Sequence, residues 1–207
     1  MKVNTVLGPV DTKELGRTLM HEHILCANWT ARMNYPDWLS RGELIDLAVK
    51  LLKRLKKCGF CTIVDGTPPA LGRDVSILKE VSEKAEINII ASTGFYWYEE
   101  VWEIDKNIDR MVKRLVNEVE KGIQGTECKA GIIKCATDRY GLSEKNRHLL
   151  QIAAKVYRET GLPIYTHTSI QNKIAPLQQE YLMELGVAPN HMVIGHLGDT
   201  DDIDFIE

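Results

Sequence analysis

The sequence lacks long apolar runs, a strong net charge and a disulfide framework. It holds no stretch of about 18 apolar residues, and its first residues lead directly into mixed sequence, so neither membrane insertion nor export is predicted. The formal net charge is only -3, from 26 basic and 29 acidic residues, which leaves no basic surface for nucleic acid or anionic lipid. Five cysteines, an odd number, fit reduced thiols better than paired ones. We therefore expect a cytoplasmic protein whose partners are small molecules, with neither nucleic acid nor membrane among them.

What the sequence does contain is a regular alternation of short apolar runs and amphipathic stretches. With 44% hydrophobic and 27% charged residues, 207 residues are enough for one domain spanning residues 1–207. Near-continuous apolar runs are typical of parallel strands that are covered on both faces. Six such strands are predicted after a short N-terminal hairpin (Thr5–Gly8 with Leu15–Thr18): Thr18–Ile24, Cys61–Val64, Asn88–Ser92, Gly131–Ala136, Pro163–Thr166 and His191–Gly195.

Helical periodicity fills the intervals between these strands. The clearest helix begins at Ser40, which forms a capping box with Glu43, and ends before Gly59. Further helices are expected from about residues 74, 105, 143 and 176, and the last three end at glycines 122, 161 and 186. Strands that alternate with helices indicate βα units.

A glycine-rich dinucleotide-binding turn is also missing, because no G-x-G-x-x-G follows any strand. This disfavours a Rossmann sheet and favours a TIM (β/α)8 barrel, which needs eight βα units and about 250 residues. Only about six units can be counted here. We therefore expect a domain that is incomplete at its C-terminal end, with exposed strand edges where the barrel is not closed.

Four histidines fall at the C-terminal ends of predicted strands, where barrel active sites are assembled. His21 and His23 are two residues apart on one strand, so their side chains project from the same face. An isolated H-x-H is as often a surface pair as a metal site. His167 and His196, each directly after another apolar run, favour the metal site.

Lys134 lies inside the apolar run Gly131–Ala136. A buried ammonium costs several kcal/mol unless it is compensated or neutralised. The lysine could face a carboxylate or reach the barrel rim, or it could act as a neutral nucleophile in Schiff-base chemistry. The residue pattern alone leaves these alternatives open.

Several motifs together resemble the phosphotriesterase family, nearest to its lactonase branch in the amidohydrolase superfamily. They occur in the family's order and spacing along the whole chain, which is more specific than any single motif. The motifs are Gly16-Arg17-Thr18-Leu19-Met20-His21-Glu22-His23, Gly72-Arg73-Asp74, Gly122-Ile123-Gln124-Gly125-Thr126, Ala130-Gly131-Ile132-Ile133-Lys134 and Gly195-His196-Leu197-Gly198-Asp199-Thr200-Asp201.

The resemblance implies a hydrolase with two divalent metal ions, zinc in the first place, with cobalt, manganese or iron as alternatives. His21 and His23 would bind the more buried ion, and His167 and His196 the more exposed one. Lys134, carboxylated by carbon dioxide, would bridge both ions and act in catalysis. Two such ions lower the pKa of a bridging water, so that hydroxide forms near neutral pH.

The family pattern also requires an aspartate at the end of the eighth strand, which would follow Glu207. The acidic residues after the sixth strand do not replace it, because they fit a helix N-terminal cluster: Asp199, Asp201, Asp202 and Asp204.

An aromatic loop follows the third predicted strand. The resemblance implies that Tyr96 lines the substrate pocket and hydrogen-bonds a substrate oxygen. Trp97, Tyr98 and Trp102 fit better as cover for the barrel or as a homodimer contact.

The leading hypothesis is therefore hydrolysis of a lactone or ester, with side activity on phosphotriesters. An amidase acting on N-acyl compounds would use the same site. A non-catalytic metal-binding protein is the alternative if the short form is natural, and a Schiff-base lyase would leave the four histidines unexplained. The physiological substrate, the metals and the oligomeric state are not encoded in any motif.

Overall fold

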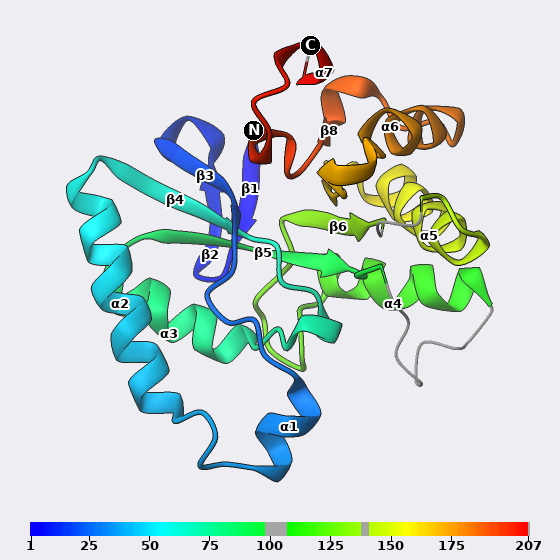
Figure 1. Ribbon diagram of the computed structural model, residues 1–207. Helices are drawn as coiled ribbons and strands as arrows, with labels where there is room; N and C mark the ends of the chain where they lie inside the picture. Colours follow the sequence, from blue (N-terminus) through cyan, green and yellow to red (C-terminus); the bar gives the residue numbers. More distant parts are fainter. Residues whose placement is uncertain (98–106, 138–140, 207) are drawn as a thin grey trace. The chain divides into compact units, whose positions relative to one another are not determined.

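The computed structural model describes residues 1–97, 107–137 and 141–206 (Figure 1). The chain divides into two compact units. Unit 1 is Met1–Thr93 with Asn117–Gly131, and unit 2 is Gly94–Val116 with Ile132–Glu207. Each unit is described by itself below. The single domain expected from the sequence stays a prediction.

Unit 1 begins with a hairpin and continues into parallel strands. Its strands are the antiparallel pair β1 (Lys2–Thr5) and β2 (Gly8–Asp11), and the parallel strands β3 (Arg17–Glu22), β4 (Phe60–Asp65) and β5 (Asn88–Gly94).

The hairpin lies earlier in the chain than predicted. Gly8, at a φ of 117°, allows the chain to turn directly after Thr5, whose hydroxyl donates a hydrogen bond to the Gly8 carbonyl at 2.7 Å. Residues from Arg17 onward, which were assigned to the second arm of the hairpin, begin β3 instead.

The helices of unit 1 are α1 (Trp29–Asn34), α2 (Arg41–Lys57) and α3 (Val75–Ala85), of which α2 packs against α3 (Figure 1). The predicted cap of α2 is confirmed, since the Ser40 hydroxyl accepts a hydrogen bond from the Glu43 N–H. Asp74 caps α3 in the same way through Ser76 and Ile77. Capping therefore sets where these two helices begin.

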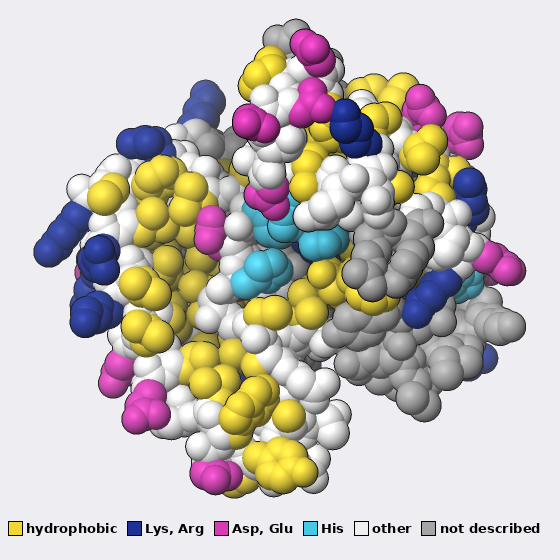
Figure 2. Space-filling model, viewed as in Figure 1, with side chains coloured by type: hydrophobic (Ala, Val, Ile, Leu, Met, Phe, Trp, Pro, Cys, Tyr) yellow, Lys and Arg dark blue, Asp and Glu magenta, His cyan; other side chains and the backbone are white. Residues whose placement is uncertain are grey.

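The core of unit 1 is formed by strand residues and the inner faces of α2 and α3, including the fully buried Ile63, Val81 and Ile89. Hydrophobic side chains also gather on the outer face of α2, where Leu47 and Leu51 are 58% and 49% exposed (Figure 2). Leu51 also lines a groove of about 240 Å³ that is formed by β3, β4 and α2. Unit 1 thus leaves apolar surface open beside β3.

Unit 2 contains three more parallel strands and their helices. These are β6 (Ile132–Ala136), β7 (Ile164–His167) and β8 (Met192–Val193), followed in turn by α5 (Glu144–Thr160), α6 (Ala175–Glu184) and α7 (Ile203–Ile206). The division between the units falls inside α4 (Ile108–Glu120). Each of the six barrel strands is thus followed by a helix, as predicted for part of a (β/α)8 barrel.

The sixth strand is much shorter than the predicted His191–Gly195. His191 lies in a short 3-10 turn before β8, and side chains take over the backbone bonds near its end. The Thr166 hydroxyl accepts from the Gly195 N–H at 3.3 Å, and the Thr168 hydroxyl donates to the Gly195 carbonyl at 2.8 Å. Because these backbone groups are already bonded, the ladder does not extend to His196.

Within the described ranges, the structure shows no helix that is both long and apolar enough to cross a membrane.

Candidate metal centre

His21 and His23 lie at the C-terminal end of β3, as the sequence predicted. Their ring centroids are 5.4 Å apart, with an interplanar angle of 65°. The pairing of β3 with β4 is irregular between Leu19 and Glu22, so the strand is locally distorted where it carries His21. The two imidazoles of unit 1 are therefore close enough to act on one ion.

His23 is held by a polar chain that runs into the interior of unit 1. Its Nδ1 lies 2.8 Å from the hydroxyl oxygen of Thr67, a residue 1% exposed in the loop after β4. Next to Thr67 is Asp65, at the end of β4, whose carboxylate accepts from the Ile24 N–H at 2.8 Å and from the Thr67 N–H at 3.0 Å. Burial raises the pKa of Asp65, while these backbone N–H groups, the Thr67 side chain and the positive charge of Arg73 act in the opposite direction.

Arg73 and its neighbours show what the Gly72-Arg73-Asp74 motif does locally. The buried guanidinium of Arg73 bonds both carboxylate oxygens of Glu118 and donates to the Ser92 carbonyl at 2.8 Å. Gly72 adopts a φ of 86°, and a Cβ there would lie 1.8 Å from the Ala27 carbonyl oxygen, so only glycine fits. This motif therefore supports the loops beneath the β3 histidines.

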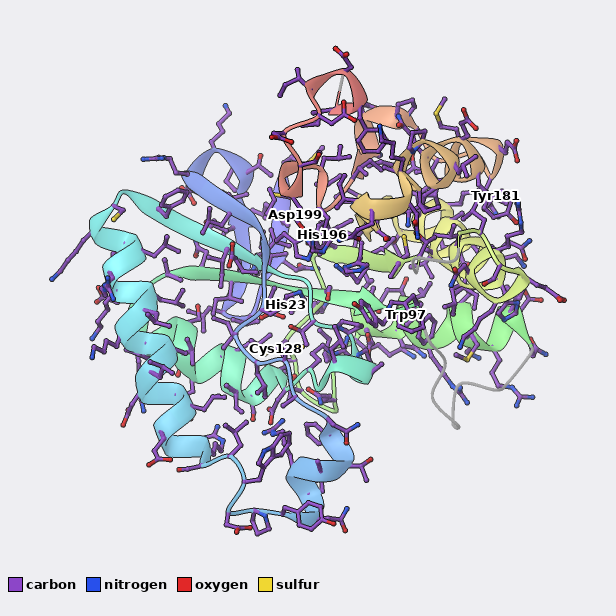
Figure 3. All side chains as sticks on the ribbon, in the orientation of Figure 1. His23, Trp97, Cys128, Tyr181, His196 and Asp199 are labelled. Carbon is purple, nitrogen blue, oxygen red and sulfur yellow. The ribbon has the colours of Figure 1, made fainter. Side chains whose placement is uncertain are left out.

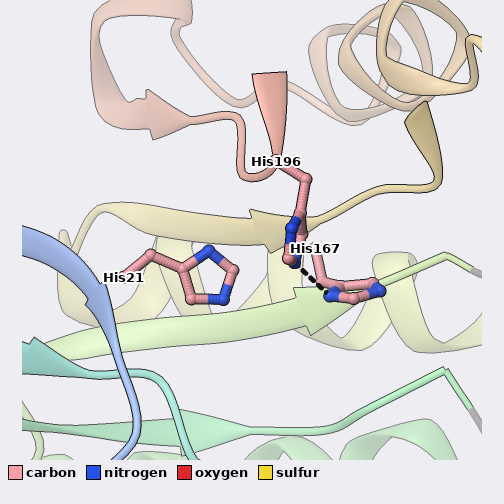
Figure 4. Close-up of side chains that lie close together, drawn as sticks. All are labelled: His21, His167 and His196. Carbon is pink, nitrogen blue, oxygen red and sulfur yellow. Dashed lines mark hydrogen bonds between the residues drawn. The ribbon is translucent and has the colours of Figure 1, made fainter. Parts of the chain in front are cut away.

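His167 and His196 form the corresponding pair in unit 2. His167 ends β7, and His196 follows β8 in a left-handed conformation with φ 66° and ψ 7°. His196 Nε2 lies 2.8 Å from His167 Nδ1, and the ring centroids are 4.3 Å apart (Figure 4). Two imidazole nitrogens that face each other at this distance can turn toward one shared ion.

The remaining nitrogens of this pair also face partners. His196 Nδ1 lies 2.7 Å from a carboxylate oxygen of Asp199, which sits beside it in Figure 3. His167 Nε2 lies 3.5 Å from the Tyr96 hydroxyl, and the two rings meet edge to face. The His167 carbonyl accepts from the buried side chain of Gln178 in α6. Both imidazoles are thus oriented from outside the pair.

The role predicted for Asp199 from the sequence was wrong. It was assigned to an acidic cluster that caps the next helix, but its carboxylate binds His196 instead. Asp202 does act as a cap, since its carboxylate accepts from the Phe205 N–H at 3.2 Å. The spacing His-x-x-Asp, which lets a carboxylate reach back across one short turn, was the available signal.

Lys134 is 1% exposed on β6, so its predicted burial is confirmed. Its Nζ lies 4.0 Å from the ring centroid of Tyr165 on the neighbouring strand β7. The Lys134 carbonyl accepts from the Phe95 N–H, and a Cβ at Gly94 would lie 2.0 Å from that carbonyl oxygen. The adjacent thiol of Cys135 is also buried, which raises its pKa to about 12. Lys134 therefore sits in a desolvated region that has close backbone packing.

Tyr96 and Trp97 lie in the described part of the predicted substrate loop. Besides facing His167, the Tyr96 ring lies 5.9 Å from that of Trp97, which is labelled in Figure 3. The Trp97 carbonyl accepts from the Asn146 side chain in α5. The predictions for Tyr98 and Trp102 lie outside the described residues. The roles of Tyr96 and of the five proposed metal ligands stay predictions.

Comparison with known proteins adds independent evidence. The family model for the phosphotriesterase family matches residues 1–207. The chain is 36% identical over 200 residues to an aryldialkylphosphatase of Saccharolobus solfataricus, covering 96% of this chain and 64% of the relative. It is 31% identical to a phospho-furanose lactonase of Mycoplasmopsis agalactiae (97% and 61%) and 30% identical to an N-acetyltaurine hydrolase of Xenopus tropicalis (96% and 65%).

The chain thus spans 61 to 65% of the length of these relatives. The match over all 207 residues confirms the resemblance seen in the motifs. This protein belongs to the phosphotriesterase family.

Proposed function

We propose that this protein is a binuclear metal-dependent hydrolase that acts on a lactone or ester, with side activity on phosphotriesters. The observation that carries the proposal is the His167–His196 pair, whose facing nitrogens lie 2.8 Å apart while Tyr96 and Asp199 orient the outer nitrogens. Relatives named as an aryldialkylphosphatase and a lactonase support both substrate classes.

The donor chemistry fits two divalent ions. His21 and His23 would supply two imidazoles to one ion, and His167 and His196 would supply two to the other. Neutral imidazole suits zinc, cobalt and iron, and an anionic oxygen ligand suits them and manganese.

Lys134 would supply that anionic ligand as a carbamate. The Lys134 ammonium would first lose one proton. The neutral Nζ would then form a bond to the carbon of carbon dioxide and lose a second proton, so that a buried cation becomes an anion with two ligand oxygens. The burial of Lys134 at 1% exposure supports this assignment, because burial disfavours the charged ammonium form of the side chain.

When bound, two such ions lower the pKa of a shared water and polarise a carbonyl or phosphoryl oxygen. The protein's own residues would orient the substrate. The Tyr96 hydroxyl, which lies 3.5 Å from His167 Nε2, would donate a hydrogen bond to a substrate oxygen beside the His167–His196 pair.

The test is metal analysis and lactone hydrolysis of the purified protein before and after treatment with a chelator. We expect about two equivalents of divalent metal, loss of activity on chelation and recovery with zinc or cobalt. His167→Ala should lower metal content, whereas His148→Ala in α5 should not. Full lactone turnover by the metal-free protein, or equal losses in both variants, would overturn the proposal. Borohydride trapping of substrate on Lys134 would instead favour the Schiff-base alternative.

A further inference from the structure

The hydrogen bonds that link His23 to Thr67 and Asp65 have a defined donor and acceptor at each step. Thr67 offers one hydroxyl proton and its oxygen lone pairs, and that oxygen lies 2.8 Å from His23 Nδ1. On its other side, the Thr67 N–H donates to the Asp65 carboxylate at 3.0 Å, and a hydrogen bond from the Thr67 side chain acts to lower the pKa of that carboxyl.

Asp65 determines which way the hydroxyl points. Its two carboxylate oxygens accept hydrogen bonds from the backbone N–H groups of Ile24 and Thr67. Asp65 therefore acts as a hydrogen-bond acceptor toward its neighbours. A hydroxyl that donates its only proton to this carboxylate can meet His23 only with a lone pair. His23 must then carry its proton on Nδ1 and present the Nε2 lone pair.

That tautomer is the one that binds metal through Nε2. A ligating imidazole has its tautomer and ring orientation fixed by the hydrogen bond that its other nitrogen donates.

We propose that Thr67 is a positioning residue for His23: with Asp65 behind it, Thr67 fixes the Nδ1–H tautomer and aims Nε2 at a divalent cation. The inference rests on the proposed function, in which His23 is a metal ligand. It assigns the loop after β4 a part in metal affinity without direct contact with the metal.

A purely structural role for Thr67 is separable from this one. Its N–H bond to Asp65 holds the loop and does not need the side chain. Thr67→Val keeps the backbone and the side-chain shape and removes the hydroxyl, whereas Thr67→Ser keeps the hydroxyl. Thr62 on β4 is a matched control, because it is equally buried and its hydroxyl donates to the Leu15 carbonyl, away from the histidines.

The experiment has two readouts on the wild-type protein and the variants Thr67→Val, Thr67→Ser and Thr62→Val. The first is the His23 tautomer in the metal-free protein, read from nitrogen-15 imidazole signals and assigned by loss of the signal in His23→Gln. The second is the dissociation constant for zinc, measured by competition with a chromogenic chelator.

We expect His23 to be protonated on Nδ1 in the wild type, in Thr67→Ser and in Thr62→Val, and to populate the Nε2–H form in Thr67→Val. Zinc binding should weaken by about 10- to 100-fold in Thr67→Val alone. An unchanged tautomer and affinity in Thr67→Val, or equal losses in Thr62→Val, would overturn the inference and leave the proposed function standing. If the wild type binds no zinc, the proposed function fails, and an Nε2–H wild type would overturn the assignment of the tautomer as well.

Discussion

His23 in unit 1 is oriented by residues that are buried and distant in the sequence, whereas His196 in unit 2 is oriented by a residue that is exposed and near in the sequence. Thr67 and Asp65 behind His23 are 1% and 0% exposed, and they lie more than 40 residues away in the sequence. Asp199 beside His196 is 60% exposed and only three residues away. Hydrogen bonds that exclude water are strong and costly to break, whereas an exposed local pair contributes little to folding. The β3 site is therefore tied to the stability of unit 1, while the site after β8 can be altered locally.

The most severe test of this comparison is Lys134→Ala, which removes the ligand proposed to serve both pairs of histidines. We expect metal content and hydrolysis to be lost together, with partial recovery when a short carboxylic acid is supplied with the metal. Metal analysis and rate measurements on one preparation check this. Full occupancy and rate in the variant would show that the two pairs bind metal independently of Lys134.

The buried side of the comparison is tested by Asp65→Ala. The variant leaves the Ile24 and Thr67 N–H groups without their acceptor, at about 1–3 kcal/mol for each buried donor. We expect the free energy of unfolding in urea to fall by roughly 2–6 kcal/mol. Asp65→Asn keeps one acceptor oxygen and should lose less. A fall below about 0.5 kcal/mol, the range of ordinary surface substitutions, would remove the distinction between the two sites.

Asp199→Ala is the matching change on the exposed side. Unfolding should shift by no more than about 0.5 kcal/mol, because the pair is local and solvated. Zinc affinity should still fall about tenfold, since His196 loses the partner of its Nδ1. Denaturation and chelator competition measure the two effects separately, and a large loss of stability would contradict the reading of this site as local.

The smallest expected effect is that of Tyr96→Phe, which removes one hydroxyl. We expect lactone turnover to fall by roughly 2- to 12-fold, the range for a hydrogen bond worth about 0.5–1.5 kcal/mol. Phosphotriester turnover should fall less, because the two substrates place their oxygens differently. Steady-state kinetics on both substrates check this, and equal losses would leave Tyr96 a packing residue.

Much of the secondary structure could be predicted from the sequence because the signals are local. Continuous apolar runs marked β4, β5, β6 and β7, and Ser40 and Ser143 marked the first turns of α2 and α5. The hairpin and the length of β8 were predicted wrongly. Both depend on a turn or on side-chain bonds from neighbouring segments, which periodicity does not record.

The residues that orient the proposed ligands were harder to predict than the ligands themselves. Histidines at strand ends are conspicuous, and so is a lysine in an apolar run. Thr67 and Asp65 are ordinary residue types whose contact with His23 arises only when β3 and β4 pair. Asp199 was visible in the sequence, but the acidic residues around it favoured a capping role.

The left-handed backbone conformation of His196 separates its imidazole, a proposed metal ligand, from the segment that follows. Non-glycine residues adopt this conformation infrequently, and here the histidine itself turns the chain three residues after the last residue of β8. The imidazole is anchored by residues before the turn and by Asp199 immediately after it, so residues 200–206 are not needed to aim it. Loops after barrel strands set substrate range. This segment can therefore diverge, or be exchanged with that of a relative, while the imidazole of His196 keeps its orientation.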